Sequence, residues 1–218
     1  MAQADLSREI LIVFTRFPQP GQTKTRLIPA LGMTGAANLQ RMMAEYTFAQ
    51  CCELANKRNL SIAVHYEGGN EQELQRWIPA SMICQPQSKG SLGERLAHSF
   101  ASSFHAGMEH VIIVGSDCPF LTPEILASGF DLLQESDLVL GPAYDGGYYL
   151  IGLSKADHLL WADIDWGTAK VLSQTIEIAR KKGLALALLP TLADIDRPED
   201  LQNLHGSSFA LHFPTSNE

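Results

Sequence analysis

The sequence predicts a three-layer α/β fold, in which a mainly parallel sheet is covered by helices on both faces. Short apolar runs alternate with longer helix-forming segments along nearly the whole chain, and this alternation is typical of parallel sheets. Two apolar runs, at 138–140 and 148–153, follow each other without a helix between them, which indicates a local antiparallel pair. With 218 residues, the chain is expected to form one domain over 1–218, with loosely held tails at 1–8 and 206–218.

The first strand is predicted over Ile10–Phe14, where every residue is apolar. The helix after it is expected from about 34 to 57, because Leu39, Met43, Tyr46 and Leu54 recur at helical spacing. Further apolar runs predict strands at 60–66, 82–84, 111–114, 138–140, 148–153 and 184–189.

Capping residues mark the expected starts of the other helices. Asn70, Thr122 and Thr168 are favourable N-cap residues, and Ser91 with Glu94 has the spacing of a capping box. These signals predict helices at about 70–77, 91–106, from 122, at 168–182 and, as a short last helix, from 196.

Composition excludes several classes of protein. The formal net charge of −8 argues against a nucleic-acid partner, because such surfaces need clustered excess lysine and arginine. No apolar run is long enough to cross a membrane, and the polar first residues lack an apolar signal region. The four cysteines form no C-x-x-C pair, so we expect reduced thiols, no zinc site and a cytoplasmic protein.

The first strand runs into a basic loop that contains Gly21, Lys24 and Arg26. Such loops can bind phosphate, because glycine lets backbone N–H groups approach the anion and the cations neutralise it. A solvated surface loop with two cations fits these residues equally well. The spacing is not that of a Walker A P-loop, since Gly21 stands only three residues before Lys24.

Two carboxylates are candidate ligands of a divalent metal ion. Asp117 follows the apolar strand at 111–114, and ligands of open α/β sheets bind beyond the carboxyl ends of the strands. Mg²⁺ and Mn²⁺ prefer such oxygen ligands, but Asp117 is also a good turn residue. Asp196 lies in an acidic segment at 194–200, where the residues alone favour capping of the last helix.

Two other loops are candidates for ligand contacts. The segment between the two antiparallel runs fits a hairpin and the wall of a small-molecule pocket equally well; its residues are Tyr144, Asp145, Gly146, Gly147 and Tyr148. The other loop places Gln87 and Gly90 ahead of the capping box. The capping box that follows is enough to explain this loop, but the amide of Gln87 could also read the edge of a nucleobase.

Five segments occur in order over nearly the whole chain: PQPGQTKTRL, GSDCPFL, GPAYDGGYYLIGL, DWGTAKVLSQT and DIDRPEDL. Together they resemble the transferase family labelled radical-SAM/selenodomain-associated or glycosyltransferase-like. That family is similar to the GT-A superfamily of nucleotide-diphospho-sugar transferases. Small nucleotidyltransferases, such as molybdenum-cofactor guanylyltransferase and phospholactate guanylyltransferase, are similar in pattern. The resemblance implies a Rossmann-like GT-A fold.

The resemblance also implies a role for each matching residue. Asp117 and Asp196 match the carboxylates that hold Mg²⁺ or Mn²⁺, and Lys24, Arg26 and Asp117 form the expected catalytic set. The implied nucleotide-binding residues are Gly21, Lys24, Arg26, Gln87 and Gly90. A small-molecule acceptor is expected along the segment from Tyr144 to Tyr148.

One departure from the pattern bears on the reaction. The nucleotidyltransferase relatives open with a glycine-rich signature, most of which is replaced here by Arg16-Phe17-Pro18 and Pro20. Proline has no N–H to donate, so the loop offers few donors to a triphosphate. We therefore expect a metal-dependent transferase that acts on a nucleotide donor, with glycosyl transfer from a nucleotide sugar favoured. The alternatives are nucleotidyl transfer from a nucleoside triphosphate to a small phosphorylated acceptor and a non-catalytic nucleotide-binding module.

Overall fold

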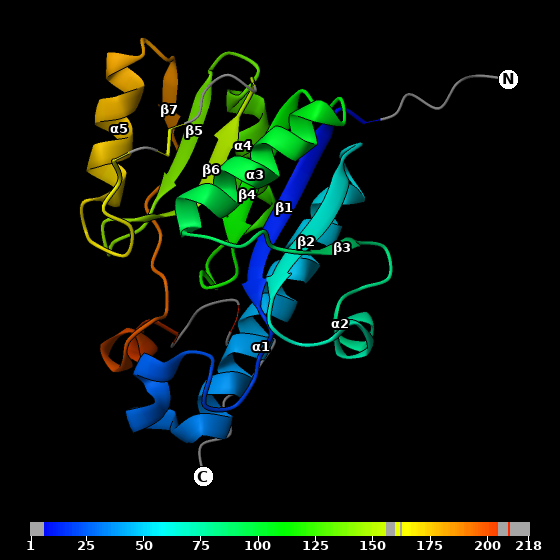
Figure 1. Cartoon of the computed structure of the whole chain (residues 1–218), viewed down its shortest axis with the longest axis vertical. Coiled ribbons are helices and arrows are strands. Elements are labelled where there is room, and N and C mark those ends of the chain that lie inside the picture. Colours follow the sequence, from blue (N-terminus) through cyan, green and yellow to red (C-terminus); the bar gives the residue numbers. More distant parts are fainter. Residues whose placement is uncertain (1–6, 156–159, 162, 205–208, 210–218) are drawn as a thin grey trace, which may run out of the picture.

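The computed structural model describes residues 7–155, 160–161, 163–204 and 209 of the chain. Its strands are β1 (Glu9–Arg16), β2 (Ser61–Glu67), β3 (Ile83–Pro86), β4 (His110–Gly115), β5 (Leu138–Pro142), β6 (Tyr148–Leu153) and β7 (Leu186–Leu188). They form one sheet in the order β3-β2-β1-β4-β6-β5-β7 (Figure 1). Parallel pairs join β1 to β2 and β4, β2 to β3, and β5 to β7. Only β6 runs antiparallel to its neighbours, so the predicted mainly parallel sheet with an antiparallel part is confirmed.

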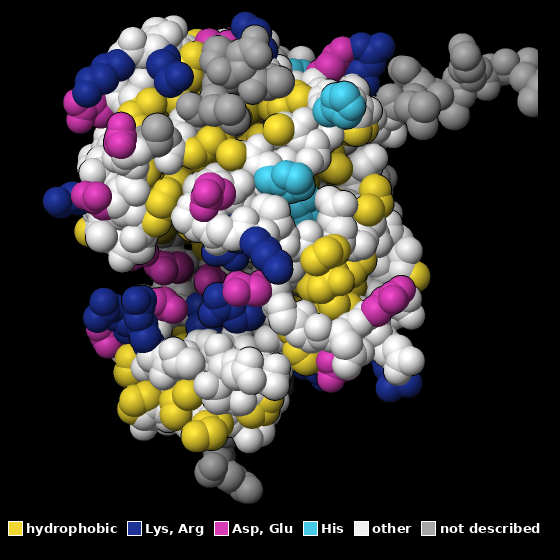
Figure 2. All heavy atoms as spheres, in the orientation of Figure 1, with side chains coloured by type: hydrophobic (Ala, Val, Ile, Leu, Met, Phe, Trp, Pro, Cys, Tyr) yellow, Lys and Arg dark blue, Asp and Glu magenta, His cyan; other side chains and the backbone are white. Residues whose placement is uncertain are grey.

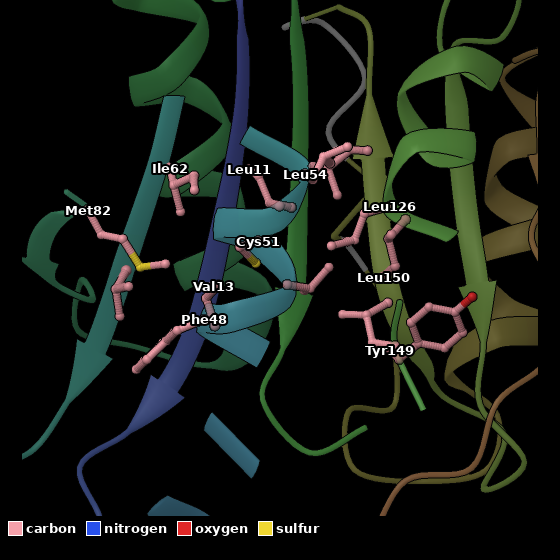
Figure 3. Close-up of a cluster of buried hydrophobic side chains, with 14 of the residues drawn as sticks. Leu11, Val13, Phe48, Cys51, Leu54, Ile62, Met82, Leu126, Tyr149 and Leu150 are labelled. Carbon is pink, nitrogen blue, oxygen red and sulfur yellow. The ribbon is translucent and has the colours of Figure 1, made fainter. Parts of the chain in front are cut away.

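The helices are α1 (Ile28–Ala55), α2 (Glu71–Trp77), α3 (Leu92–His105), α4 (Pro123–Leu132) and α5 (Val171–Lys181), with 3-10 segments η1 (Thr25–Leu27) and η2 (Pro198–Leu204). Successive strand side chains point to opposite faces, and both faces of β1 are buried. Leu11 and Val13 belong to the core beneath α1 and α4 (Figure 3). Ile10 and Ile12 belong to the core beneath α3 and α5. The strands therefore form the middle layer of three.

The local capping signals were mostly reliable. The side chains of Asn70, Ser91 and Thr122 each accept a hydrogen bond from the backbone N–H three residues further on. The predicted cap at Thr168 is wrong: α5 begins at Val171, and the Thr168 hydroxyl donates to a carbonyl at 2.7 Å instead. Helix α1 begins before residue 34 but is broken at Gly32, whose φ of 69° is not helical.

A small lobe stands at the carboxyl ends of the strands, made by η1, the first part of α1 and η2 (Figure 1). Its buried residues include Leu27, Met43 and Ile195. Phe209 also belongs to it, with 1% of its surface exposed, so this part of the expected tail is packed. At the other end of the chain, the Arg8 carbonyl accepts a hydrogen bond from the Glu109 N–H at 2.7 Å. Residues 1–6, 205–208 and 210–218 of the expected tails lie outside the described residues.

The described part of the chain has no helix that is both long and apolar enough to span a membrane.

A buried histidine on β2 predicts how stability depends on pH. The Nδ1 atom of His65 lies 2.8 Å from Ser99 Oγ, and burial, with a smaller effect of His98, lowers the pKa of His65 to about 4 from an ordinary value of 6.5. Protonation therefore favours the unfolded chain, and the stability present above pH 6.5 is lost as the pH falls toward 4. We expect this to cost up to about 3 kcal/mol between pH 7 and pH 4.

Urea unfolding at a series of pH values measures this loss. The His65→Gln variant should lose less stability than the wild type over that range, whereas His105→Gln, at an exposed position, should retain the wild-type dependence. Identical pH dependence in wild type and His65→Gln would contradict the expectation.

Candidate active site

The carboxyl ends of β1, β2 and β4 open into a cleft of about 470 Å³, which we call the strand-end cleft. On one side of β1 lies β2, the next strand along the chain, and on the other side lies β4. The cleft is at the end of β1, where the strand order reverses, and α/β sheets commonly bind ligands at such a point. Figure 2 shows lysine, arginine, aspartate and glutamate side chains gathered around the hollow between the sheet and the lobe. The lining includes Lys24, Arg26, Asp117 and Asp196, so the structure brings these four predicted site residues together.

Lys24 lies at the centre of this group. Its Nζ donates to the Ile195 carbonyl at 2.7 Å and lies 3.1 Å from Asp117 Oδ1 and 3.5 Å from Asp196 Oδ1. Only 4% of the Lys24 side chain is exposed. The backbone of Lys24 is left-handed, with φ 49°, a conformation that costs a non-glycine residue about 1–3 kcal/mol. The basic loop therefore points its lysine inward, onto the two carboxylates, which the sequence did not indicate.

Arg26 and Asp196 form an ion pair beside Lys24. Burial on its own raises the pKa of Asp196, but the charges and hydrogen bonds of Lys24 and Arg26 outweigh burial, so that pKa lies below its usual value. The expectation that Asp196 caps the last helix is wrong. The Asp196 side chain contacts Lys24 and Arg26 instead, while the carboxylate of Asp200, within η2, accepts from the backbone N–H groups of Asp196 at 3.0 Å and Arg197 at 2.7 Å.

Asp117 is joined to the segment that carries Asp196 through the backbone. The Ile195 N–H donates to the Asp117 carbonyl at 3.0 Å, which fixes the two acidic segments side by side. The Asp117 side chain is about half exposed and turns toward Lys24. Its carboxylate therefore faces the strand-end cleft.

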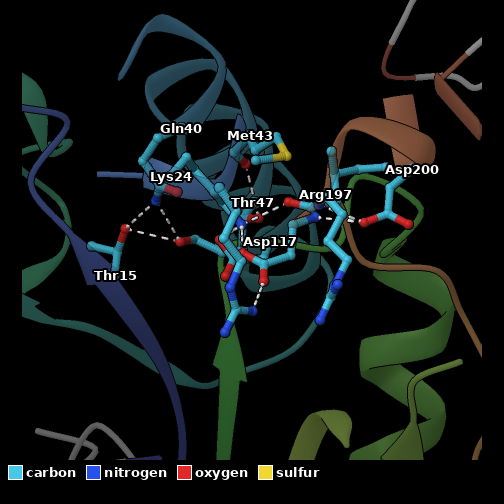
Figure 4. A network of polar contacts seen from close by, with 12 residues as sticks. Thr15, Lys24, Gln40, Met43, Thr47, Asp117, Arg197 and Asp200 are labelled. Atoms are coloured by element: carbon cyan, nitrogen blue, oxygen red, sulfur yellow. Dashed lines mark hydrogen bonds and ion pairs between the residues drawn. The ribbon is translucent and has the colours of Figure 1, made fainter. Parts of the chain in front are cut away.

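A buried polar cluster that was not predicted from the sequence lies behind the cations (Figure 4). Thr15 Oγ1 and Ser116 Oγ are 2.9 Å apart, and the Gln40 amide donates to Ser116 at 3.0 Å and to Thr15 at 3.4 Å. All three residues line the strand-end cleft. One signal could have identified Gln40, because it is a polar residue within the buried stripe of α1.

Gln87 lies in the strand-end cleft, but its side chain is held by the protein. Its amide donates to the His65 carbonyl at 2.9 Å, and its oxygen accepts from Arg95 at 2.6 Å. Arg95 also contacts Glu67 at 3.2 Å, and its buried Nε has no hydrogen-bond partner among the residues that the structure describes. The Gln87 amide, which was predicted to contact a ligand, is thus engaged within the protein. The charged side chains of Arg95 and Glu67 line the same cleft beside it.

The two loop glycines shape turns and line neither the strand-end cleft nor the two clefts that adjoin it. Gly21 has φ 78° and Gly90 has φ 117°, conformations that favour glycine. At Gly90 a Cβ atom would lie 2.6 Å from the Glu94 carboxylate, so this glycine leaves room for the capping box.

Lys24, Arg26, Asp117 and Asp196 form a group that we call the ion cluster. Two further clefts adjoin the strand-end cleft there. The loop cleft, of about 530 Å³, is lined by Tyr144, Asp145 and the 193–203 segment, and the tyrosine cleft, of about 330 Å³, by Asp145, Gly147 and Tyr148. The segment between β5 and β6 thus both connects the antiparallel strands and forms cleft walls. Arg26 and Asp196 line all three clefts.

Not every residue of that segment faces a cleft. Gly146 packs against Ala169, and a Cβ atom added to Gly146 would lie 2.3 Å from the Ala169 carbonyl oxygen.

Asp194, which lies outside that segment, lines both the loop cleft and the tyrosine cleft. Burial raises the pKa of Asp194 to about 6, and the charge of Asp145 adds to this effect.

Asp117 and Asp196 are the residues that could hold a divalent cation, if a bound ligand supplied further oxygen atoms. No cluster of three or more His, Cys, Asp or Glu side chains suitable for a metal occurs among the residues that the structure describes. However, the carboxylates of Asp117 and Asp196 already converge on one cationic atom, the Nζ of Lys24. Mg²⁺ is usually bound through one or two carboxylates together with substrate phosphates, and this pair meets that requirement.

Comparison with solved structures gives the same fold. A protein from Desulfovibrio desulfuricans G20, described as a "putative nucleotide-diphospho-sugar transferase", is 30% identical with a TM-score of 0.83, over 94% of this chain and 90% of its own. CMP:2-keto-3-deoxy-manno-octonic acid synthetase complexed with CTP has 12% identity and a TM-score of 0.57, over 94% and 98% of the two chains. The inositol-1-phosphate CTP transferase from T. maritima has 16% identity and a TM-score of 0.52, over 89% and 91%.

Sequence comparison supplies the family. No curated protein matches the chain, but the family model described as "Uncharacterized protein conserved in bacteria (DUF2064)" matches residues 48–168. This match covers more than half of the 218 residues. Together with the 30% identical relative, it shows that the chain belongs to the DUF2064 family and has the fold of the nucleotide-diphospho-sugar transferases.

Proposed function

We propose that this protein is a metal-dependent transferase that acts on a nucleotide donor, with a nucleotide sugar as the favoured donor. The observation that carries the proposal is the cluster of Lys24, Arg26, Asp117 and Asp196 at the point where three clefts meet. The description of the Desulfovibrio relative and the CTP in a structure of the same fold support a nucleotide donor. The resemblance of the motifs supports the radical-SAM/selenodomain-associated branch as part of the same proposal, and the four free cysteines support a cytoplasmic location.

Each cleft then has a part in the reaction. Asp117 and Asp196 would hold Mg²⁺ or Mn²⁺, which supplies positive charge to phosphate oxygens as the leaving group departs. Arg26, 61% exposed and facing all three clefts, binds the donor phosphates and stabilises charge that grows in the transition state. The strand-end cleft receives the nucleoside, with Arg95 and Glu67 within it. Its volume lies in the range of small-molecule sites.

The acceptor side is formed by the tyrosine cleft and the loop cleft. Asp145 and Asp194 line both of them, and carboxylates accept hydrogen bonds from hydroxyl groups. A small hydroxyl-bearing acceptor therefore fits this side. Because Arg26 lines all three clefts, an acceptor bound here reaches the same cation as the donor phosphates.

The loop after β1 favours a diphosphate donor over a triphosphate. Pro18 and Pro20 have no N–H, and the N–H groups of Gln19, Gln22 and Thr23 donate to carbonyls within the loop, at 2.8–3.2 Å. Few backbone donors therefore remain for phosphate oxygens. This observation favours glycosyl transfer over nucleotidyl transfer from a nucleoside triphosphate to a phosphorylated acceptor.

Calorimetric titration with Mn²⁺ present tests the donor class. Nucleoside diphosphates and sugar nucleotides are expected to bind at least as tightly as the triphosphates with the same base, measured on one protein preparation. A tenfold preference for a triphosphate, about 1.4 kcal/mol, would favour nucleotidyl transfer instead. Binding without metal-dependent turnover of any donor would favour the non-catalytic nucleotide-binding module.

A further inference from the structure

We propose that Lys24 is an internal cation that occupies the metal position, so that a divalent metal ion binds this site only together with a phosphate-bearing ligand. The inference rests on the proposed function, in which Asp117 and Asp196 hold the metal. It goes further by stating that binding of the metal is coupled to binding of the ligand. It assigns Lys24 two alternating partners, the carboxylates and the donor phosphates.

The first argument is geometric. The Nζ of Lys24 has three oxygen atoms around it, at 2.7 Å from Ile195, 3.1 Å from Asp117 and 3.5 Å from Asp196. A Mg²⁺ ion would need carboxylate oxygens at about 2.0–2.1 Å, and a cation bridging the same two carboxylates would lie where the ammonium is. The two cations therefore exclude each other, and Lys24 must move before the metal can enter.

The second argument concerns the cost of that movement. The Lys24 side chain is 4% exposed, and all its close polar contacts named above are with the ion cluster and the Ile195 carbonyl. A buried charge without a partner is strongly unfavourable, so the ammonium leaves the carboxylates only for another anion. Lys24 also lines the strand-end cleft beside Thr25 and Arg26, where donor phosphates would supply such an anion.

Charge balance leads to the same coupling. The Lys24 ammonium and the Arg26 guanidinium already lie against the carboxylates of Asp117 and Asp196. A divalent ion that enters alone is repelled by these two cations, and a phosphate-bearing ligand that binds them relieves the repulsion. By linkage, the ligand raises metal affinity by the same factor as the metal raises ligand affinity.

The Lys24→Met variant tests the inference without nucleotide. Methionine keeps an unbranched side chain but has no charge, so the carboxylates become free to bind Mn²⁺ on their own. We expect Mn²⁺, measured from the electron paramagnetic resonance signal of the free ion, to bind this variant at least tenfold more tightly than the wild type. Lys181→Met, which removes an exposed lysine paired with Glu177 on α5, should bind Mn²⁺ as the wild type does.

A folded Lys24→Met variant with wild-type Mn²⁺ affinity would overturn the inference, and thermal unfolding shows whether it is folded. The wild type provides a second measurement that needs no variant. Its Mn²⁺ affinity should rise at least tenfold when ADP, CDP, GDP or UDP is present, after correction for Mn²⁺ bound by the nucleotide itself. If a nucleotide binds and the Mn²⁺ affinity does not change, the coupling is absent and the inference is wrong.

The two proposals fail in different ways. If none of the four nucleotides binds while Lys24→Met still gains Mn²⁺ affinity, the proposed function is wrong and Lys24 remains the internal cation of a metal site. If nucleotides bind and are turned over while Lys24→Met gains no Mn²⁺ affinity, the transferase proposal stands and the inference about Lys24 fails.

Discussion

Replacement of Asp117 by Asn is expected to lower metal-dependent turnover of the nucleotide donor at least about 100-fold, the usual effect of removing one electrostatic group from a catalytic site. The variant keeps the shape of the side chain but loses the charge that would hold the metal. Folding should be little affected, because about half of the Asp117 side chain is exposed. Lys24 would still contact Asp196 and the Ile195 carbonyl.

Turnover with Mn²⁺ and thermal unfolding of the same preparation check this prediction. Asp131→Asn is a matched control, because Asp131 is an exposed aspartate that pairs with Arg58 at 2.6 Å and lines none of the three clefts. Its turnover should equal that of the wild type. If Asp117→Asn retained the Mn²⁺ dependence and rate of the wild type, Asp117 would be only a turn residue.

The inner strands could be predicted from the sequence because β1, β2, β4, β5 and β6 are largely buried, and each then appears as a short apolar run. The two remaining expected runs correspond to the edge strands β3 and β7, which are exposed or only partly buried. Helix starts depend on local hydrogen bonds and were equally accessible at Asn70, Ser91 and Thr122. The start of α5 was not, because the Leu172 N–H donates to the Gly146 carbonyl at 2.9 Å. This contact between distant segments replaces a local cap, and no local pattern encodes it.

For the candidate site, the sequence indicated which segments meet but not how their side chains pair. Arg26 and Asp196 are 170 residues apart, and both were singled out from their own segments. Lys24 points inward from a left-handed backbone conformation, which nothing in the residues around it requires. Likewise, Gln87 was singled out for its amide, but that amide is engaged by Arg95 and the β2 backbone.

Gly146→Ala is expected to destabilise the protein by about 2–5 kcal/mol. The left-handed conformation of Gly146, with φ 90°, costs an alanine about 1–2 kcal/mol, and forcing a methyl group into a packed site costs about 1–3 kcal/mol more. The new Cβ would lie 2.3 Å from the Ala169 carbonyl oxygen and 2.7 Å from its Cα. Both are backbone atoms, so no change of side-chain rotamer relieves the overlap.

The Gly146→Ala substitution should also change activity, and only on the acceptor side of the site. The loop that must move carries Asp145 and Gly147, which line the tyrosine cleft but not the strand-end cleft. We therefore expect acceptor-dependent turnover to fall while donor affinity changes little, measured on the folded fraction. Gly107→Ala is the matched control, because Gly107 has φ 89° and a methyl group added there would meet no side chain or distant backbone atom within 4 Å. It carries the backbone cost alone, so equal loss of stability in the two variants would show that the contact with Ala169 does not matter.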